Sequence, residues 1–382
     1  MLRRGLIHLC ILLLISGISQ QIWLAEAYAE MAARPDSDEK MVRELVKQKE
    51  QAVNQRKWRS YLRLLDPAKK MYIQEQKRWF QDAVQYIDAG SFRLKVLSVV
   101  PLNKDQMCVW VHQSYTKNGK MYAVKFPLLF LRTRQGWKDA DLAFKQLPSD
   151  FITVYYSDSS LEDQAHIALD TLNKAVYVFK QRFDWSPARI EVKLYHDPEL
   201  FRQSVKPSLP SWAGGWHEAG ESIKLIGGLP NSAVFASGLV HELTHQMVSE
   251  LTNDNAAYWL QEGAAMYYEL HLLPGLHDGY SLEWDTEQMM SVSELEHTNL
   301  ERLSPREAAR YYQTCYRLFS YLIETYGDQQ IQKVFSVLRK SPPVDVDSSQ
   351  KLRLLNEKTG EAVREVLGIS MEELDRNWRR TK

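Results

Sequence analysis

The sequence predicts an α+β fold in two parts. Residues 38–147 carry helical patterns followed by four alternating strand patterns, whereas residues 151–382 open with a strand, a helix and a strand and continue mainly as helices. The second part also holds a five-residue motif with two histidines four positions apart on a predicted helix. We therefore expect a small α+β module in front of a larger domain that joins a sheet lobe to a mainly helical lobe.

Residues 1–29 predict an export signal. Arg3 and Arg4 precede an apolar run over residues 6–18, and the Ala-Tyr-Ala at residues 27–29 suits a signal peptidase. Apolar character resumes at residues 22–24, so both a cleaved signal and a retained anchor stay open. In either case we expect a secreted protein, or one on the extracellular face of the cell membrane and associated with the cell envelope.

The front module, residues 38–147, begins with helical patterns at residues 39–65 and 67–87. The strand patterns that follow lie at residues 92–101, 106–115, 121–132 and 136–144. Asn118-Gly119 between the second and third strands is a strong hairpin signal. The order of helices and strands resembles the NTF2-like or cystatin-like α+β fold. No catalytic constellation is visible here, and residues 148–150 (Pro-Ser-Asp) mark the junction to the second part.

The second part, residues 151–382, begins with strands at residues 151–156 and 189–195 around a helix at residues 161–183. Residues 221–227 then alternate polar and apolar side chains between glycines, which predicts a short edge strand. The unpaired backbone groups of an edge strand can hold an extended peptide. Ile223, Lys224 and Leu225 are therefore the candidates for substrate binding.

The most informative motif reads H-E-L-T-H at residues 241–245. It lies in a helix predicted over residues 232–251, where His241 and His245 share one face and Glu242 sits beside them. Two imidazoles at this spacing can bind one metal ion. A single structural histidine on an apolar helix is common, but two that flank a glutamate are hard to explain as core filling.

The third ligand is predicted on the next helix, residues 258–270. A catalytic zinc uses three protein ligands, often two His and one Glu, and leaves a position open. Glu262 is the preferred ligand, and the small residues 263–265 (Gly-Ala-Ala) would let its helix pack closely on the H-E-L-T-H helix. The competing ligands are Asp254, Glu269, His271 and Glu250.

The run W-L-Q-E-G-A-A at residues 259–265 resembles the W-L-x-E-G-x-A run of M1-type aminopeptidases and of peptidase MA-like domains in bacterial secreted proteins. From residue 151 onward the chain is similar to the gluzincin metallopeptidases, in which a helix after the HExxH helix donates a glutamate ligand. The resemblance implies a zincin fold with a mixed sheet, Zn²⁺ bound by His241, His245 and Glu262, and Glu242 as general base.

The chain departs from these families in three places. The connector between the second histidine and Glu262 is shorter, and Met266 stands where thermolysin-like enzymes carry an acid that orients a histidine. The group that orients the outer nitrogen of His241 is therefore not predicted. Residues 213–220 also lack the G-x-M-E-N motif that anchors a free amine in M1 enzymes, so exopeptidase activity loses support.

A tyrosine helix is predicted over residues 308–326. Its Y-x-Q-x pattern is similar to the tyrosine-bearing helix of MA-like domains, which makes Tyr311 the first candidate for a phenol that stabilises an oxyanion and Tyr312 the second. The chain has 19 tyrosines, so packing of the helix is the competing explanation. Residues 341–349 read as a loop before two terminal helices.

The composition of the chain bears on its partners and on its disulfides. The chain has 48 Lys plus Arg and 48 Asp plus Glu, which gives no reason to expect nucleic acid. Without Cys10, which lies in the signal, Cys108 and Cys315 remain, too few for a disulfide framework.

The sequence predicts an exported zinc metallopeptidase that acts on a peptide or protein substrate. In the chemistry expected of it, a zinc ion lowers the pKa of water to about 7 and Glu242 transfers a proton to the leaving amine. The alternative is a catalytically weak, zinc-containing binding module at the cell surface. Glu242 argues against the alternative, because a structural zinc needs no base beside its ligand.

Overall fold

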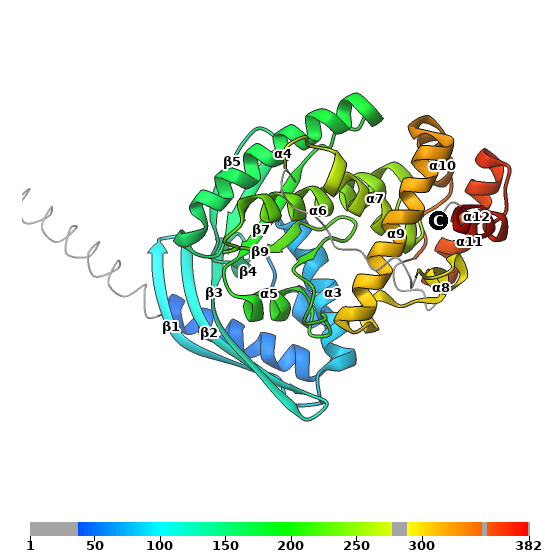
Figure 1. Ribbon diagram of the computed structural model, residues 1–382. Coiled ribbons are helices and arrows are strands. Elements are labelled where there is room, and N and C mark those ends of the chain that lie inside the picture. Colours follow the sequence, from blue (N-terminus) through cyan, green and yellow to red (C-terminus); the bar gives the residue numbers. More distant parts are fainter. Residues whose placement is uncertain (1–36, 277–288, 346–349, 381–382) are drawn as a thin grey trace, which may run out of the picture. The chain divides into compact units, whose positions relative to one another are not determined.

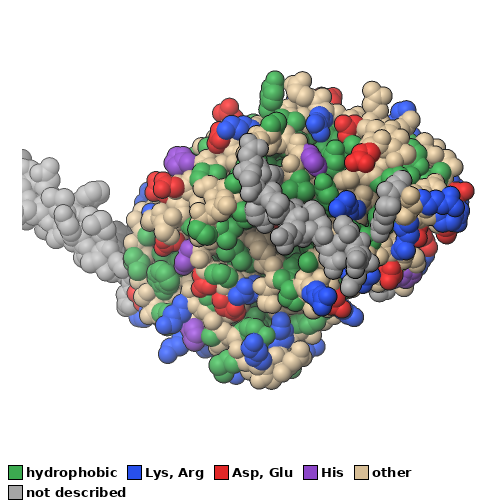
Figure 2. Space-filling model, viewed as in Figure 1, with side chains coloured by type: hydrophobic (Ala, Val, Ile, Leu, Met, Phe, Trp, Pro, Cys, Tyr) green, Lys and Arg blue, Asp and Glu red, His purple; other side chains and the backbone are tan. Residues whose placement is uncertain are grey.

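The computed structural model describes residues 37–276, 289–345 and 350–380. The predicted export signal, residues 1–29, lies outside these ranges. Within them, each helix is too short or too polar to cross a bilayer. Figure 2 shows acidic, basic and hydrophobic side chains interspersed over one face, in keeping with the equal numbers of acidic and basic residues.

The described chain is mixed α+β, as predicted, and divides into two compact units. The first unit comprises the described residues up to Ala68 together with Asp88–Leu142, and the second comprises Lys69–Ile87 and the described residues from Ala143 onward. The described chain therefore passes from the first unit into the second at residue 69, back into the first at residue 88, and again into the second at residue 143.

The first unit is a four-stranded antiparallel sheet with helices (Figure 1). Its helices are residues 37–54 and α2 (Trp58–Leu62). Its strands, in the order in which they pair, are β1 (Arg93–Asn103), β2 (Gln106–Lys117), β3 (Lys120–Thr133) and β4 (Gly136–Leu142). The predicted hairpin is present between β2 and β3, where Asn118 and Gly119 have φ of 51° and 74°. The NTF2-like resemblance of this part stays a prediction.

Helix α3 (Lys70–Tyr86) belongs to the second unit, so the predicted junction at residues 148–150 does not hold for it. The buried Glu75 of α3 pairs with Lys193, and the indole nitrogen of Trp79 donates to the carbonyl of Gln203. An amphipathic pattern predicts the helix but does not say which partner its buried face will meet. These partners lie more than a hundred residues further along the chain.

The second unit contains a five-stranded mixed sheet in the order β5-β6-β7-β9-β8. The strands are β5 (Lys145–Pro148), β6 (Ile152–Tyr156), β7 (Ile190–Tyr195), β8 (Gly215–Trp216) and β9 (Ile223–Ile226). β6, β7 and β9 are parallel, whereas β5 and β8 run antiparallel at the two edges. The long helix α4 (Glu162–Phe183) connects β6 to β7 and packs on β6, and α5 (Pro198–Val205) follows β7.

The predicted edge strand is therefore wrong in position. Residues 221–227 contain β9, which is paired on both sides, and the edge is the two-residue strand β8. Ile223, Lys224 and Leu225 are buried, so they do not offer a free edge to a substrate. A two-residue strand is too short to show alternation, which explains why the sequence pattern pointed to its neighbour.

Helices make up the rest of the second unit (Figure 1). They are α6 (Ser232–Thr252), α7 (Tyr258–His271), α8 (Val292–His297), α9 (Pro305–Tyr326), α10 (Asp328–Lys340), α11 (Lys351–Leu367) and α12 (Met371–Arg379). α7 packs on both α6 and α9. A Cβ on Gly263 would lie 2.7 Å from the carbonyl oxygen of Cys315, so this small residue serves the close approach of α7 to α9 rather than to α6.

Candidate metal centre

Helix α6 presents both histidines and the glutamate of the motif. It begins at Asn231, whose side chain accepts hydrogen bonds from two backbone N–H groups of the first turn. Four of its apolar residues, Leu239, Val240, Leu243 and Met247, are fully buried in the core of the second unit. The imidazoles are therefore fixed by a helix that is held along most of its length.

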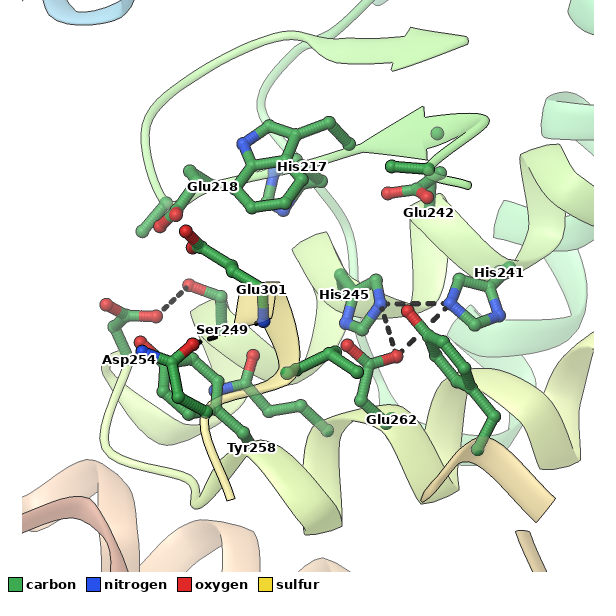
Figure 3. Close-up of a pocket in the computed structure, with 18 of the residues that line it drawn as sticks. His217, Glu218, His241, Glu242, His245, Ser249, Asp254, Tyr258, Glu262 and Glu301 are labelled. Atoms are coloured by element: carbon green, nitrogen blue, oxygen red, sulfur yellow. Dashed lines mark hydrogen bonds and ion pairs between the residues drawn. The ribbon is translucent and has the colours of Figure 1, made fainter. Parts of the chain in front are cut away.

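His241, His245 and Glu262 point toward one another (Figure 3). The Nε2 atoms of the two histidines are 3.1 Å apart, and Glu262 Oε2 lies 3.4 Å from His241 Nε2 and 3.3 Å from His245 Nε2. Ligands about 2.0–2.1 Å from a tetrahedral metal are separated by about 3.3–3.4 Å. The three atoms therefore fit a zinc ion.

The charges of this cluster keep Glu262 in the ionised form that a metal ligand needs. Burial would raise the pKa of Glu262, but the charge of His245 and hydrogen bonds from both histidines outweigh it and lower the pKa to about 2. Burial would lower the pKa of His241, but hydrogen bonds to Glu262 and Glu269 raise it well above its usual value, so a metal ion would displace a proton from this imidazole. The carboxylate is thus ionised, as a metal ligand must be.

Glu269 supplies the contact that the sequence did not predict. Its Oε2 lies 3.0 Å from Nδ1 of His241, the nitrogen on the far side of the ring from Glu262. Such a carboxylate fixes the tautomer and the orientation of a metal-binding imidazole. The sequence does contain a signal for this contact. Glu262 and Glu269 are seven residues apart on α7, so they lie on one face of the helix.

The other competing ligands lie elsewhere. Glu250 accepts from the indole nitrogen of Trp185 at 2.7 Å, and His271 Nε2 lies 3.1 Å from the hydroxyl of Tyr316. Asp254 accepts from Ser249 at the end of α6. Over the described ranges, His241, His245 and Glu262 are the group of three side chains arranged to share a metal ion.

Glu242 lines the same pocket and lies against the edge strand. Its side chain is 7% exposed, and Oε2 has no hydrogen-bond partner among the described residues. A Cβ on Gly215 of β8 would come within 2.9 Å of its Cδ atom. A side chain at residue 215 would therefore displace this carboxylate.

The structure corrects the choice of tyrosine by one position. Tyr311 is fully buried in the core, whereas Tyr312 lines the pocket with its ring centroid 6.1 Å from that of His241. Neighbouring residues on a helix point about 100° apart. Because the two tyrosines are adjacent and chemically identical, the sequence could not say which one faces the pocket.

The pocket has a volume of about 290 Å³ and two ends (Figure 3). One end holds the three metal-binding candidates and Glu242. The other end is lined by Glu218, Ser249, Asp254, Tyr258, Glu301 and Lys351. β8 lies in the wall, so the pocket joins a candidate metal site to the last strand of the sheet among the described residues.

The ligand triangle, the adjacent glutamate and the mixed sheet with its edge strand define a metallopeptidase-like domain. Residues 185–381, just over half of the chain, match the Peptidase MA superfamily. The chain belongs to this superfamily.

Solved structures that match the chain include native yeast LTA4 hydrolase. That structure is 17% identical to the chain, has a TM-score of 0.35, and is matched over 68% of this chain and 43% of its own length. The chain thus spans less than half of that protein. A search of curated protein sequences gives no match.

Proposed function

We propose that this protein is an exported zinc-dependent metallopeptidase that hydrolyses peptide bonds. The observation that carries the proposal is the triangle of His241, His245 and Glu262, with separations of 3.1–3.4 Å. Beside it lies the buried Glu242, whose Oε2 has no hydrogen-bond partner in the described part of the chain. A zinc ion in this triangle would lower the pKa of water to about 7 and polarise the substrate carbonyl.

Glu242 is the general base of the proposed reaction. Its Oε2 has no partner among the described residues, so it is available to accept a proton from water and to pass it to the leaving amine. Burial raises the pKa of Glu242, which is opposed by the charges of His245 and His241. A raised pKa suits a carboxylate that must both take and release a proton near neutral pH.

Three further groups complete the proposed site. Tyr312 replaces Tyr311 as the phenol that donates a hydrogen bond to the developing oxyanion. Glu269 holds the ring of His241. The outer edge of β8, which pairs with no other described strand than β9, takes the place of Ile223, Lys224 and Leu225 and pairs with the extended substrate. Export is proposed from residues 1–29, which carry the signal pattern.

The test is metal analysis together with cleavage of a peptide library by the protein purified from its export compartment. We expect about one zinc per chain, peptide cleavage, and loss of cleavage after chelation with recovery on adding zinc. If the protein contains zinc but cleaves no peptide, the zinc-containing binding module becomes the better explanation. If it contains no zinc, both hypotheses are wrong.

A further inference from the structure

Six charged side chains form a continuous network from the pocket into the sheet of the second unit. They are Glu218, Arg78, Glu221, Lys224, Glu75 and Lys193, in the order in which they pair. Acids and bases alternate along the network, so its formal charges sum to zero. Two of its members, Glu75 and Arg78, come from α3, which lies outside residues 185–381, the segment that matches the superfamily.

The inner half of the network joins α3 to the sheet. Glu75 lies 2.6 Å from Lys193 Nζ on β7 and 3.3 Å from Lys224 Nζ on β9, and it also accepts from the backbone N–H of Ser222 at 3.1 Å. These side chains are almost completely buried, so α3 is held firmly against the sheet.

The outer half reaches the pocket through Arg78. Its guanidinium contacts two carboxylates at once, Glu221 through Nε at 2.6 Å and Glu218 through Nη1 at 3.1 Å. The planar guanidinium holds two acids in a fixed relation, which a lysine cannot do. Glu221 lies two residues before β9, whereas Glu218 lines the pocket three residues after Gly215, the residue beside Glu242.

We propose that Arg78 is a positioning residue of the candidate peptidase site, which acts through Glu218 to fix the loop after β8 and so the substrate-binding end of the pocket. This inference rests on the proposed function for its effect on catalysis. The geometry points to Arg78 because its side chain reaches from α3 to a pocket residue, Glu218.

Electrostatics agree with this role. Burial would raise the pKa of Glu218, but the charge of Arg78, followed by those of Lys351, Lys206 and Lys224, outweighs burial and lowers it. Arg78 therefore keeps Glu218 ionised as well as in place. A purely stabilising ion pair would affect folding alone, whereas a positioning residue affects substrate binding through its partner.

The experiment compares Arg78→Met, Glu218→Gln and the double variant in the zinc-loaded full chain, with Lys70→Met as control. Lys70 is an exposed lysine at the start of the same helix. For Arg78→Met we expect KM for a peptide substrate to rise about tenfold, which is the size of effect expected from loss of the charge-assisted contact with Glu218. We expect kcat to stay within about twofold of wild type. Adding Arg78→Met to Glu218→Gln should change KM little further, because both act through one contact.

Hydrogen exchange of residues 213–222 gives a readout that needs no hydrolysis. We expect faster exchange in Arg78→Met than in wild type or Lys70→Met, with unchanged zinc content. Should Arg78→Met fail to fold, Arg78→Lys keeps the charge without the planar guanidinium and should show a smaller change of the same kind. If wild type cleaves nothing, the proposed function fails and exchange alone decides the inference. Exchange and KM equal to those of Lys70→Met, or effects of Arg78→Met and Glu218→Gln that multiply independently, would overturn it.

Discussion

The two histidines of α6 are the residues on which the metal site depends most. Replacing His245 by alanine removes one of three ligands, so we expect zinc content to fall from about one per chain to a small fraction of that value. His166→Ala, at an exposed position of α4, should keep its zinc. Elemental analysis of the dialysed proteins measures both, and equal zinc in the two variants would contradict the ligand assignment.

A variant of Glu242 distinguishes the binding of the metal from the hydrolysis of the peptide. Glu242→Gln keeps the size and packing of the side chain but removes the proton acceptor, so zinc should stay while the rate of peptide cleavage falls by about three orders of magnitude or more. The measurement is kcat/KM beside zinc content on the same sample. A glutamine variant as active as wild type would show that the base lies elsewhere.

The tyrosine prediction now concerns Tyr312. Its phenol faces the pocket, so Tyr312→Phe should lower kcat about a hundredfold with little change in KM, since an oxyanion contact forms mainly in the transition state. Tyr311→Phe is the matched control, because that ring is buried in the core. Steady-state kinetics of the two variants decide the matter, and a larger loss in Tyr311→Phe would restore the sequence-based choice.

At the scale of residues, the sequence predicted the features that depend only on the spacing of side chains along one helix. His241, Glu242 and His245 follow from the four-residue period, and Glu262 follows from its motif. Which of Tyr311 and Tyr312 faces the pocket depends on the rotation of α9 about its axis, and packing decides that rotation. Site roles of all these residues stay predictions until the variants are measured.

At the scale of elements, the close approach of β8 to α6 gives a sharp prediction. In Gly215→Ala the new Cβ would displace the Glu242 carboxylate, so we expect kcat to fall at least tenfold while zinc content and thermal stability stay near wild type. Gly214→Ala serves as control, because a Cβ there meets no atom within 4 Å. Kinetics with parallel zinc analysis test this, and equal activity of the two variants would show that the approach is unimportant.

Most elements of the second unit could be predicted from the sequence. Strands near residues 151–156 and 189–195, the long helix between them, and α6, α7 and α9 are all present close to their expected bounds. The edge strand was predicted in the wrong place, because β8 is only two residues long whereas the sequence around β9 alternates polar and apolar side chains. Strand order depends on pairing between distant segments, and the local pattern of one segment does not contain it.

At the scale of the whole molecule, the buried charges that hold α3 predict an acid-sensitive fold. Burial would raise the pKa of Glu75, but the charges of Lys193 and Lys224 lower it from 4.5 to about 2. Because the folded pKa lies below the unfolded one, the contribution of Glu75 to stability is complete above about pH 4.5 and is lost as the pH falls toward 2.

Glu75→Gln should destabilise the protein at neutral pH by about 3–5 kcal/mol, because it removes the acid that pairs with the buried Lys193 and Lys224, of which Lys224 keeps Glu221. It should also flatten the fall of stability between pH 4.5 and 2. Glu324→Gln, at an exposed position of α9, is the control. Urea denaturation at several pH values measures both effects, and parallel curves for wild type and Glu75→Gln below pH 4.5 would count against the network.

The division of the chain was the least predictable feature. Helix α3 follows a predicted helix and precedes the strands of the first unit, so the sequence groups it with them. Its Glu75 pairs instead with Lys193 and Lys224, which lie within strands β7 and β9 of the second unit. A charged residue inside a strand reads as a solvent-facing position unless its partner is known, and that partner is far away in sequence.

The path of α3 also sets an order for biosynthesis. Glu75 precedes Lys193 by 118 residues and Ser222 by 147 residues. At about 5–20 residues per second, a ribosome delivers Lys193 on the order of ten seconds after Glu75. The strands of the first unit leave the ribosome during that wait, so we expect this unit to fold first while α3 remains hydrated. The histidines of α6 emerge later still, and the metal-binding pocket is therefore among the last parts of the newly made chain to form.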